Sequence, residues 1–210
     1  MYSQKGEDNI IWDFFQDKGI KGSFLDIGAN DGNTLSNTYR FAQDGWSGCL
    51  IDASPMAFKR LQDIHGENKN LHLFNYAITD RDGECDFHES GSIKIHREGL
   101  NNVGLVSSMH ERTIPKWKGR VDFQKITVPC KTFGSFFAES PIKKFEYISI
   151  DIEGEEMNVL KQMNLGDLGC VLLCIEHNQS LECPEYLEYC SQWGFSELFR
   201  TRANIILTRI

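Results

Sequence analysis

The sequence predicts an α/β fold built on a Rossmann-like, mostly parallel sheet with one antiparallel edge strand. Short apolar runs alternate with segments of helical periodicity, and this alternation favours parallel strands joined by right-handed crossovers. A glycine-bearing loop follows the first apolar run, and polar residues close several later runs. The last two apolar runs have no helical segment between them, which predicts the antiparallel edge.

The first half of the chain begins with an amphipathic helix over about residues 6–17, where Ile10, Ile11, Phe14 and Phe15 share one face. A helix is also expected to start at Pro55, because proline is tolerated in a first helical turn. Strands are expected over 23–27, 48–51 and 71–77, with a further helix over 35–42.

The second half has the same alternation around a weakly periodic centre. Residues 99–120 are polar and contain glycine, so we expect a lid or substrate loop there. We expect one domain over 1–210, with a helical segment over 1–20. Strands are predicted over 85–89, 93–95, 126–128, 147–150, 171–175, 195–199 and 204–207, and helices over 133–137, 155–163 and 184–193.

Composition narrows the function classes. The net charge of −8 argues against a broad nucleic-acid-binding face, and we interpret the cluster of Lys116, Lys118 and Arg120 as a solvated loop. No apolar stretch has the length of a membrane helix, and the polar N-terminus is unlike a signal peptide. Seven cysteines without Cys-x-x-Cys spacing indicate reduced thiols and a cytoplasmic protein. Zinc is not expected, because cysteines and histidines form no cluster with ligand spacing. A divalent cation on the oxygens of Asp151, Glu153 and Glu176 is an alternative that acid spacing alone does not establish, so no metal site is predicted.

The most informative segment runs from Ser23 to Gly32 and reads as a strand followed by a glycine loop. A second strand ends in Asp52, which is the position of an acid that binds ribose hydroxyls in such sheets. Asp52 would otherwise cap the next helix, but Ser54 already suits that role. The loop candidates for cofactor contact are Asp26, Gly28, Ala29, Asn30 and Gly32, and those after the second strand are Asp52, Ala53 and Ser54.

Weaker candidates lie on the next two elements. Asn37 and Thr38 either face the loop or lie on a solvated helix face. Asn75 and Ala77 close the third predicted strand, where they either read an adenine edge or pack within the strand.

Catalytic candidates follow the two later buried strands. Asp151 ends one strand before a glycine turn and an acid-rich helix start, and Glu176 with His177 ends the next. Histidine has a pKa suited to general-base chemistry near neutrality. We therefore assign Asp151, Glu176 and His177 to the reaction centre, although a histidine at this position is also a common structural hydrogen-bonding group.

These motifs together resemble the FkbM-type methyltransferases that use S-adenosyl-L-methionine (SAM). The resemblance spans nearly the whole chain and rests on the segments Ser3-Gln4-x-Gly6-Glu7-Asp8, Leu25 to Gly32, Ile51 to Pro55, Asn75-x-Ala77-Ile78, Ser107-Ser108, Ile150 to Glu156 and Ile175 to His177. It implies a class I methyltransferase sandwich, SAM as cofactor, and O-methylation of a hydroxyl on a sugar or other small metabolite. It also implies a small-molecule partner, while the charge and the lack of a long apolar stretch predict neither a nucleic-acid nor a membrane partner.

Two other functions remain open at this point. A nicotinamide-dependent oxidoreductase on a similar sheet would also use Asp52, but Asp31 within the loop suits a diphosphate poorly. A non-catalytic nucleoside-binding module would not need Asp151 and His177. The acceptor and the oligomeric state have no signature in the sequence.

Overall fold

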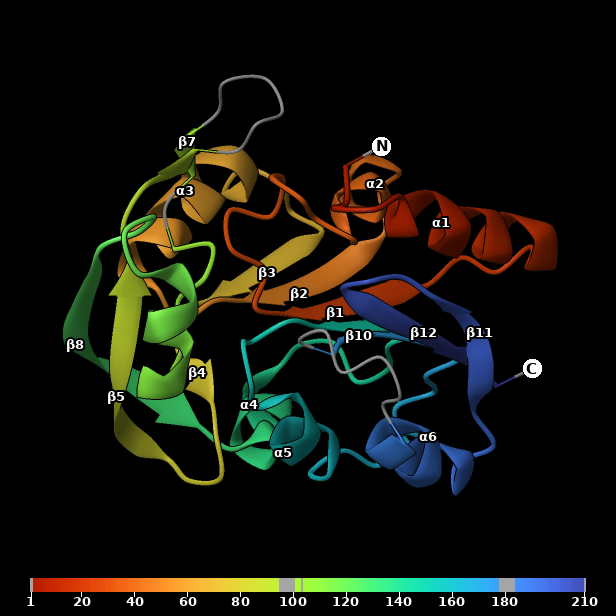
Figure 1. The fold of residues 1–210 in the computed structure, drawn as a ribbon. Helices are drawn as coiled ribbons and strands as arrows, with labels where there is room; N and C mark the ends of the chain where they lie inside the picture. Colours follow the sequence, from red (N-terminus) through yellow and green to blue (C-terminus); the bar gives the residue numbers. More distant parts are fainter. Residues whose placement is uncertain (1, 95–100, 103, 178–183, 210) are drawn as a thin grey trace.

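The computed structural model describes residues 2–94, 101–102, 104–177 and 184–209. Its centre is a seven-stranded sheet in the order β11-β12-β10-β9-β1-β2-β3, of which β12 runs antiparallel to its neighbours (Figure 1). This confirms the mostly parallel sheet with an antiparallel strand beside one edge. The strands are β1 (Ser23–Ile27), β2 (Ser47–Ile51), β3 (Leu71–Phe74), β9 (Tyr147–Ile150), β10 (Leu172–Glu176), β11 (Ser196–Arg200) and β12 (Asn204–Thr208).

Helices cover both faces of this sheet (Figure 1). Alternate residues of β1 enter opposite cores, so Phe24 packs toward α1 and α2 while Leu25 packs toward α4 and α5. One face carries α1 (Glu7–Lys18), α2 (Tyr39–Gln43) and α3 (Pro55–His65), and the other carries α4 (Phe133–Glu139), α5 (Glu156–Leu160) and α6 (Pro184–Ser191). No helix in the described ranges is long and apolar enough to cross a membrane.

A smaller sheet stands beside the β3 end of the main sheet (Figure 1). It contains β4 (Ala77–Ile78), β5 (Gly83–Ser90) and β8 (Phe123–Lys131), and β6 (Ile93–Lys94) pairs separately with β7 (Asn101–Asn102). The 3₁₀ helix η1 (Glu111–Trp117) lies in the segment that connects β7 to β8. The expected loop over 99–120 therefore contains a short strand and a helix, and its residues 99, 100 and 103 lie outside the described residues.

Several predicted elements differ in their bounds, such as the strand over 126–128, which is the longer β8, and the helix over 155–163, which is the shorter α5. Two further differences have a cause that the structure shows. The third strand ends at Phe74 rather than Ala77, because the Asn75 amide donates to the Asp52 carbonyl at 2.8 Å and Ala77 joins β8 in the smaller sheet. The helix predicted over 35–42 begins only at Tyr39. Leu35 has a left-handed φ of 57°, and the Ser36 hydroxyl accepts the Thr38 and Tyr39 amides in a turn that replaces the first helical bonds.

The face under α1 and α2 is filled by aromatic side chains. Phe41 lies at the centre, with ring centroids 5.6 Å from Phe15, 4.9 Å from Trp46 and 5.2 Å from Tyr147. All four side chains are buried, so this cluster fixes the short α2 against the sheet.

Replacing Phe41 with alanine should lower the free energy of unfolding by about 3–5 kcal/mol, because it removes a buried ring and leaves a cavity. Urea denaturation measures the change. Phe199, which is 45% exposed on β11, provides the control, and Phe199→Ala should cost less than about 0.5 kcal/mol. Equal losses for the two variants would contradict the assignment of Phe41 to the core.

Candidate active site

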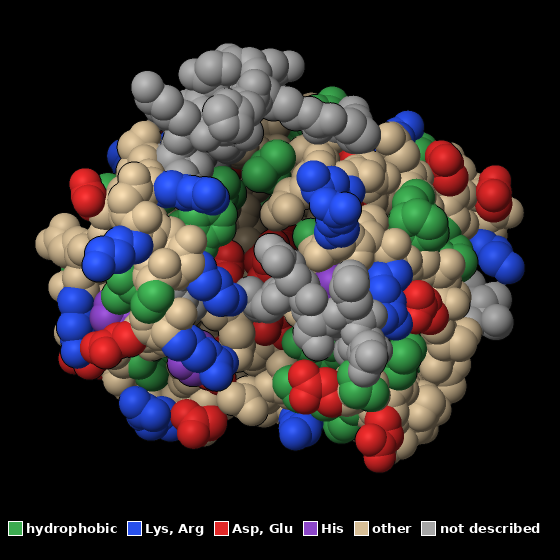
Figure 2. Space-filling view, in the orientation of Figure 1, with side chains coloured by type: hydrophobic (Ala, Val, Ile, Leu, Met, Phe, Trp, Pro, Cys, Tyr) green, Lys and Arg blue, Asp and Glu red, His purple; other side chains and the backbone are tan. Residues whose placement is uncertain are grey.

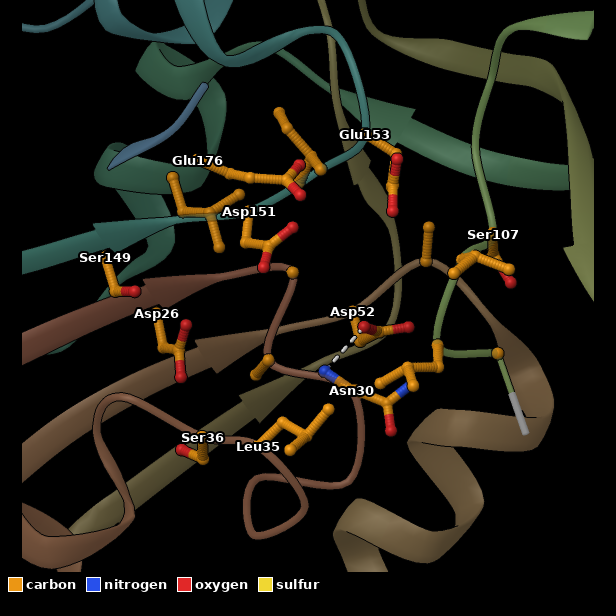
Figure 3. Close-up of a pocket in the computed structure, with 18 of the residues that line it drawn as sticks. Asp26, Asn30, Leu35, Ser36, Asp52, Ser107, Ser149, Asp151, Glu153 and Glu176 are labelled. Atoms are coloured by element: carbon orange, nitrogen blue, oxygen red, sulfur yellow. Dashed lines mark hydrogen bonds between the residues drawn. The ribbon is translucent and has the colours of Figure 1, made fainter. Parts of the chain in front are cut away.

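A cavity of about 1080 Å³ opens at the carboxyl ends of β1, β2, β9 and β10. Asp26, Asp52, Asp151 and Glu176 come from these four strand ends and line the same space (Figure 3). Figure 2 shows the hollow, with acidic side chains visible inside it. The strand ends singled out in the sequence are therefore brought together at one edge of the sheet, where open α/β sheets bind ligands.

Gly28 allows the three central strands to approach one another at this edge. Its amide donates to the Ile51 carbonyl at 2.9 Å, and its φ is 88°. A Cβ added here would lie 1.7 Å from the Asp151 carbonyl oxygen, so no other residue fits without moving the backbone. Gly32 also has a positive φ, but a Cβ there would meet Leu61 and His65, so this glycine packs against α3 and does not line the cavity.

The Asp52 carboxylate is held by two backbone amides. Its Oδ2 accepts the Asn30 amide at 2.7 Å (Figure 3), and its Oδ1 accepts the Ser54 amide at 2.8 Å. Burial raises the pKa of Asp52 to about 7, against these two hydrogen bonds that favour the ionised form. Each carboxylate oxygen has a second lone pair beyond the one that these amides use, and Asp52 lines the cavity, so the group can accept hydroxyl donors there.

Several predicted cofactor residues support the wall rather than form it. Ser54 caps α3 by accepting the Ala57 amide at 3.1 Å, and the Asn75 amide group fixes the Asp52 backbone. Thr38 donates to Asp26 Oδ2 at 2.6 Å. In contrast, Ala29, Asn30, Asn37, Ala53 and Ala77 line the cavity directly.

Asn37 presents an unused acceptor. Its Oδ1 is buried without a hydrogen-bond partner among the described residues, while its Nδ2 lies 3.6 Å from the Cys174 sulfur. An acceptor of this kind in a cavity wall fits a ligand that brings an N–H or O–H donor.

Asp151 and Glu176 form a pair of carboxyl groups in the cavity (Figure 3). Burial and the charge of Glu156 raise the pKa of Asp151 to about 6, while a hydrogen bond from Glu176 lowers it. Burial and the charge of Asp151 raise the pKa of Glu176 well above its ordinary value. Burial together with the negative charge of the neighbouring carboxyl group therefore favours the protonated form of both acids, and the pKa of Glu176 is raised strongly.

Glu153 is an additional acid of the cavity, which the sequence suggested only as an alternative cation ligand and not as a catalytic or cofactor-binding residue. It has a left-handed φ of 56°, and burial raises its pKa to about 8. Glu156 holds this conformation, because its carboxylate accepts the Ile152 amide at 3.1 Å and the Gly154 amide at 2.9 Å. Within the described ranges, no set of three or more His, Cys, Asp or Glu side chains is arranged to hold a metal ion.

The structure does not bring His177 into the cavity. Its Nε2 lies 3.0 Å from the Thr201 carbonyl, and its amide donates to the Ala203 carbonyl at 2.9 Å. His177 therefore fixes the turn between β11 and β12. Adjacent residues of a strand point to opposite sides, and here Glu176 is the one that faces the cavity.

The N-terminal segment forms part of the cavity rim. Asp8 accepts the Ser3 hydroxyl at 2.6 Å, and Glu7 accepts the Thr201 hydroxyl at 2.8 Å, which holds the segment against the β11–β12 turn. Gln4 and Lys5 consequently line the cavity. The motif Ser3-Gln4-x-Gly6-Glu7-Asp8 was the sequence signal for this arrangement.

The substitution Asp26→Asn tests whether the buried charge of Asp26 lowers the stability of the fold. Burial raises the pKa of Asp26 to about 7, above its unfolded value, so the ligand-free protein loses stability as pH rises toward 7. Asparagine removes that penalty and still accepts the Thr38 hydroxyl. Thermal and urea unfolding at pH 8 should show a gain of up to about 4 kcal/mol that shrinks as pH approaches 4. If the gain in the free energy of unfolding were the same at both pH values, the buried charge of Asp26 would not be its cause. An equal gain for the exposed Asp80→Asn would contradict that cause as well.

Comparisons with known proteins agree with this geometry. A model of the FkbM methyltransferase domain matches residues 26–197. The 2-O-methyltransferase NoeI of Sinorhizobium fredii (strain NBRC 101917 / NGR234) is 26% identical over 137 residues, which cover 65% of this chain and 55% of that protein. The chain therefore spans about half the length of this curated relative.

Solved structures support the fold alone. Monomeric WbdD superposes with a TM-score of 0.52 at 11% identity, covering 98% of this chain and 41% of that one. The methyltransferase domain of METTL16 gives 0.51 at 9% identity, covering 95% of this chain and 64% of that one. These likenesses confirm the class I methyltransferase architecture. Because the family model extends from β1 into β11, the chain belongs to the FkbM methyltransferase domain family.

Proposed function

We propose that this protein transfers a methyl group from SAM to a hydroxyl of a sugar or other small metabolite. The observation that carries the proposal is the position of Asp52, whose two oxygens are oriented by backbone amides at the edge of a cavity that also contains the Asp151–Glu176 pair. Family membership and the 2-O-methyltransferase name of the curated relative support the same reaction.

The cofactor would lie along the ends of β1 and β2. Asp52 accepts the two ribose hydroxyls, and the free Oδ1 of Asn37 accepts the amino group of the methionine part. The Gly28–Ala29 backbone has no side chain large enough to block close approach. Apolar residues of the cavity wall suit an adenine ring, and they are Ile51, Ala53, Ala77, Ile78, Phe87 and Met109. SAM supplies an electrophilic methyl group bound to a sulfonium.

The chain's own part in the reaction is to position the acceptor and take its proton. With SAM bound, the acceptor oxygen would form a bond to the methyl carbon while the carbon–sulfur bond breaks and leaves its electron pair on sulfur. The hydroxyl proton passes to the ionised Asp151 carboxylate, and Glu176 keeps that carboxylate oriented through their shared hydrogen bond.

A nicotinamide-dependent oxidoreductase is less consistent with the loop. The Asp31 carboxylate accepts the Asn33 amide at 3.0 Å and the Thr34 amide at 2.7 Å. Backbone amides after the first strand are the groups that bind a diphosphate in dinucleotide-binding sheets. Here two of them are occupied by an internal carboxylate, which would also repel the phosphates.

Asp52→Ala should weaken binding of SAM and of S-adenosylhomocysteine at least about 30-fold, because it removes both ribose acceptors. Isothermal titration calorimetry measures the change, with circular dichroism to confirm folding. Asp63→Ala, an exposed acid on α3, serves as the control and should bind normally. Unchanged affinity in the Asp52 variant would remove this residue from the cofactor site.

Asp151→Asn should lower kcat/KM at least about 100-fold while leaving cofactor affinity within about threefold, once methyl uptake from labelled SAM has identified an acceptor. In the wild type, kcat/KM should fall tenfold per unit below pH 6, because protonation of Asp151 removes the base. A flat profile between pH 5 and 8 would refute this role, as would full activity of the variant.

A further inference from the structure

Four basic side chains line a cavity whose floor is acidic. Lys5 comes from the N-terminal segment, Lys116 and Arg120 from η1 and the turn after it, and Arg202 from the β11–β12 turn. Figure 2 shows Lys and Arg side chains around the hollow. This concentration of positive charge stands out on a chain whose net charge is −8.

These four cations have no carboxylate partner within 4 Å in the described part of the chain. Some other exposed basic residues are paired, as in Lys59–Asp63 and Lys125–Asp86. The charge of Lys116 lowers the pKa of Glu153 without forming such a pair. The cations at the rim are therefore available to an anionic ligand.

The backbone around η1 selects which side chains reach the cavity. The Arg120 amide donates to the Trp117 carbonyl at 2.9 Å, and Val121 is buried after this turn. Lys116, Trp117 and Arg120 consequently line the cavity, whereas Lys118 of the same cluster does not. All three side chains are exposed, as the sequence-based interpretation of a solvated loop expects, and Lys116 and Arg120 differ from Lys118 in that they also line the cavity.

The cofactor's own carboxylate does not account for these cations. Lys5 belongs to the segment in which Ser3 pairs with Leu35, on the proposed cofactor side. Lys116 and Arg120 belong to the segment that packs over the smaller sheet, where Ser108 pairs with His88 and donates to the Glu153 carbonyl. The single carboxylate of the cofactor would lie on the Lys5 side. The positive charges of Lys116 and Arg120 therefore remain available to a second ligand.

We propose, on the basis of the methyl-transfer function above, that the acceptor carries a phosphate group that is bound by Lys116 and Arg120. A phosphate carries up to two charges and matches the planar fork of an arginine, so two cations suit it better than a neutral sugar. Trp117 between them offers an aromatic face to the body of the acceptor, and the acceptor hydroxyl then points toward Asp151.

In the first test, inorganic pyrophosphate is titrated into protein saturated with S-adenosylhomocysteine, and isothermal titration calorimetry measures the binding. We expect saturable 1:1 binding that weakens with rising salt, and at least tenfold weaker binding of malonate, a dicarboxylate of similar size. Absence of saturable pyrophosphate binding would overturn the proposal. Malonate binding as tight as that of pyrophosphate would also overturn it, in favour of a carboxylate-bearing acceptor.

Matched variants locate the site. Lys116→Ala and Arg120→Ala should each weaken pyrophosphate binding about tenfold, and Lys118→Ala should change it less than twofold. S-adenosylhomocysteine affinity, measured separately, should be unchanged in all three. A parallel loss of that affinity would assign the cations to the cofactor and overturn the proposal. Failure of the wild type to bind S-adenosylhomocysteine would instead contradict the methyl-transfer function itself.

Discussion

The close passage of β1 between β2 and β9 at Gly28 is the constraint on which the rest of this structure depends. The Gly28 amide is bonded to the end of β2, and its missing side chain admits the Asp151 carbonyl from the end of β9. Because the three strand ends meet without an intervening side chain, Asp52 and Asp151 line one cavity rather than two separate edges. A larger residue at this position would move the proposed ribose-binding acid, Asp52, away from the proposed base, Asp151.

The site combines an acidic floor with a basic rim. Burial raises the pKa of Asp26 and of Asp52 to about 7, so the empty cavity carries an electrostatic cost that positively charged and hydroxyl-bearing ligands relieve. A sulfonium cofactor suits that floor. The basic rim makes the electrostatic potential at the mouth of the cavity positive. This potential would attract an anionic acceptor despite the negative net charge of the protein.

Strands with strong apolar character were predictable from the sequence, and those around the site most of all. The runs 23–27 and 147–150 coincide with β1 and β9, because strands buried on both faces read as continuous apolar segments. The end of the third strand was missed, because the side chain of Asn75 bonds to a neighbouring strand end and redirects the chain. The start of α2 was missed because a serine turn satisfies the amides that a helix would use.

The site was predictable as a set of strand ends and less so as individual side chains. Strand periodicity indicates that only one of Glu176 and His177 faces the ligand, but it does not say which one. The roles of Lys116 and Arg120 depend on a turn whose direction no local pattern reveals. The contribution of Glu7 depends on Thr201, almost two hundred positions later in the chain, and such a contact follows from the tertiary fold alone.

Calorimetric titration of the wild-type protein with S-adenosylhomocysteine and, in parallel, with NAD tests the central claim most directly. The account predicts 1:1 binding of S-adenosylhomocysteine and no detectable binding of NAD, because the loop after β1 binds its own carboxylate where a diphosphate would lie. Binding of NAD together with failure to bind S-adenosylhomocysteine would contradict it.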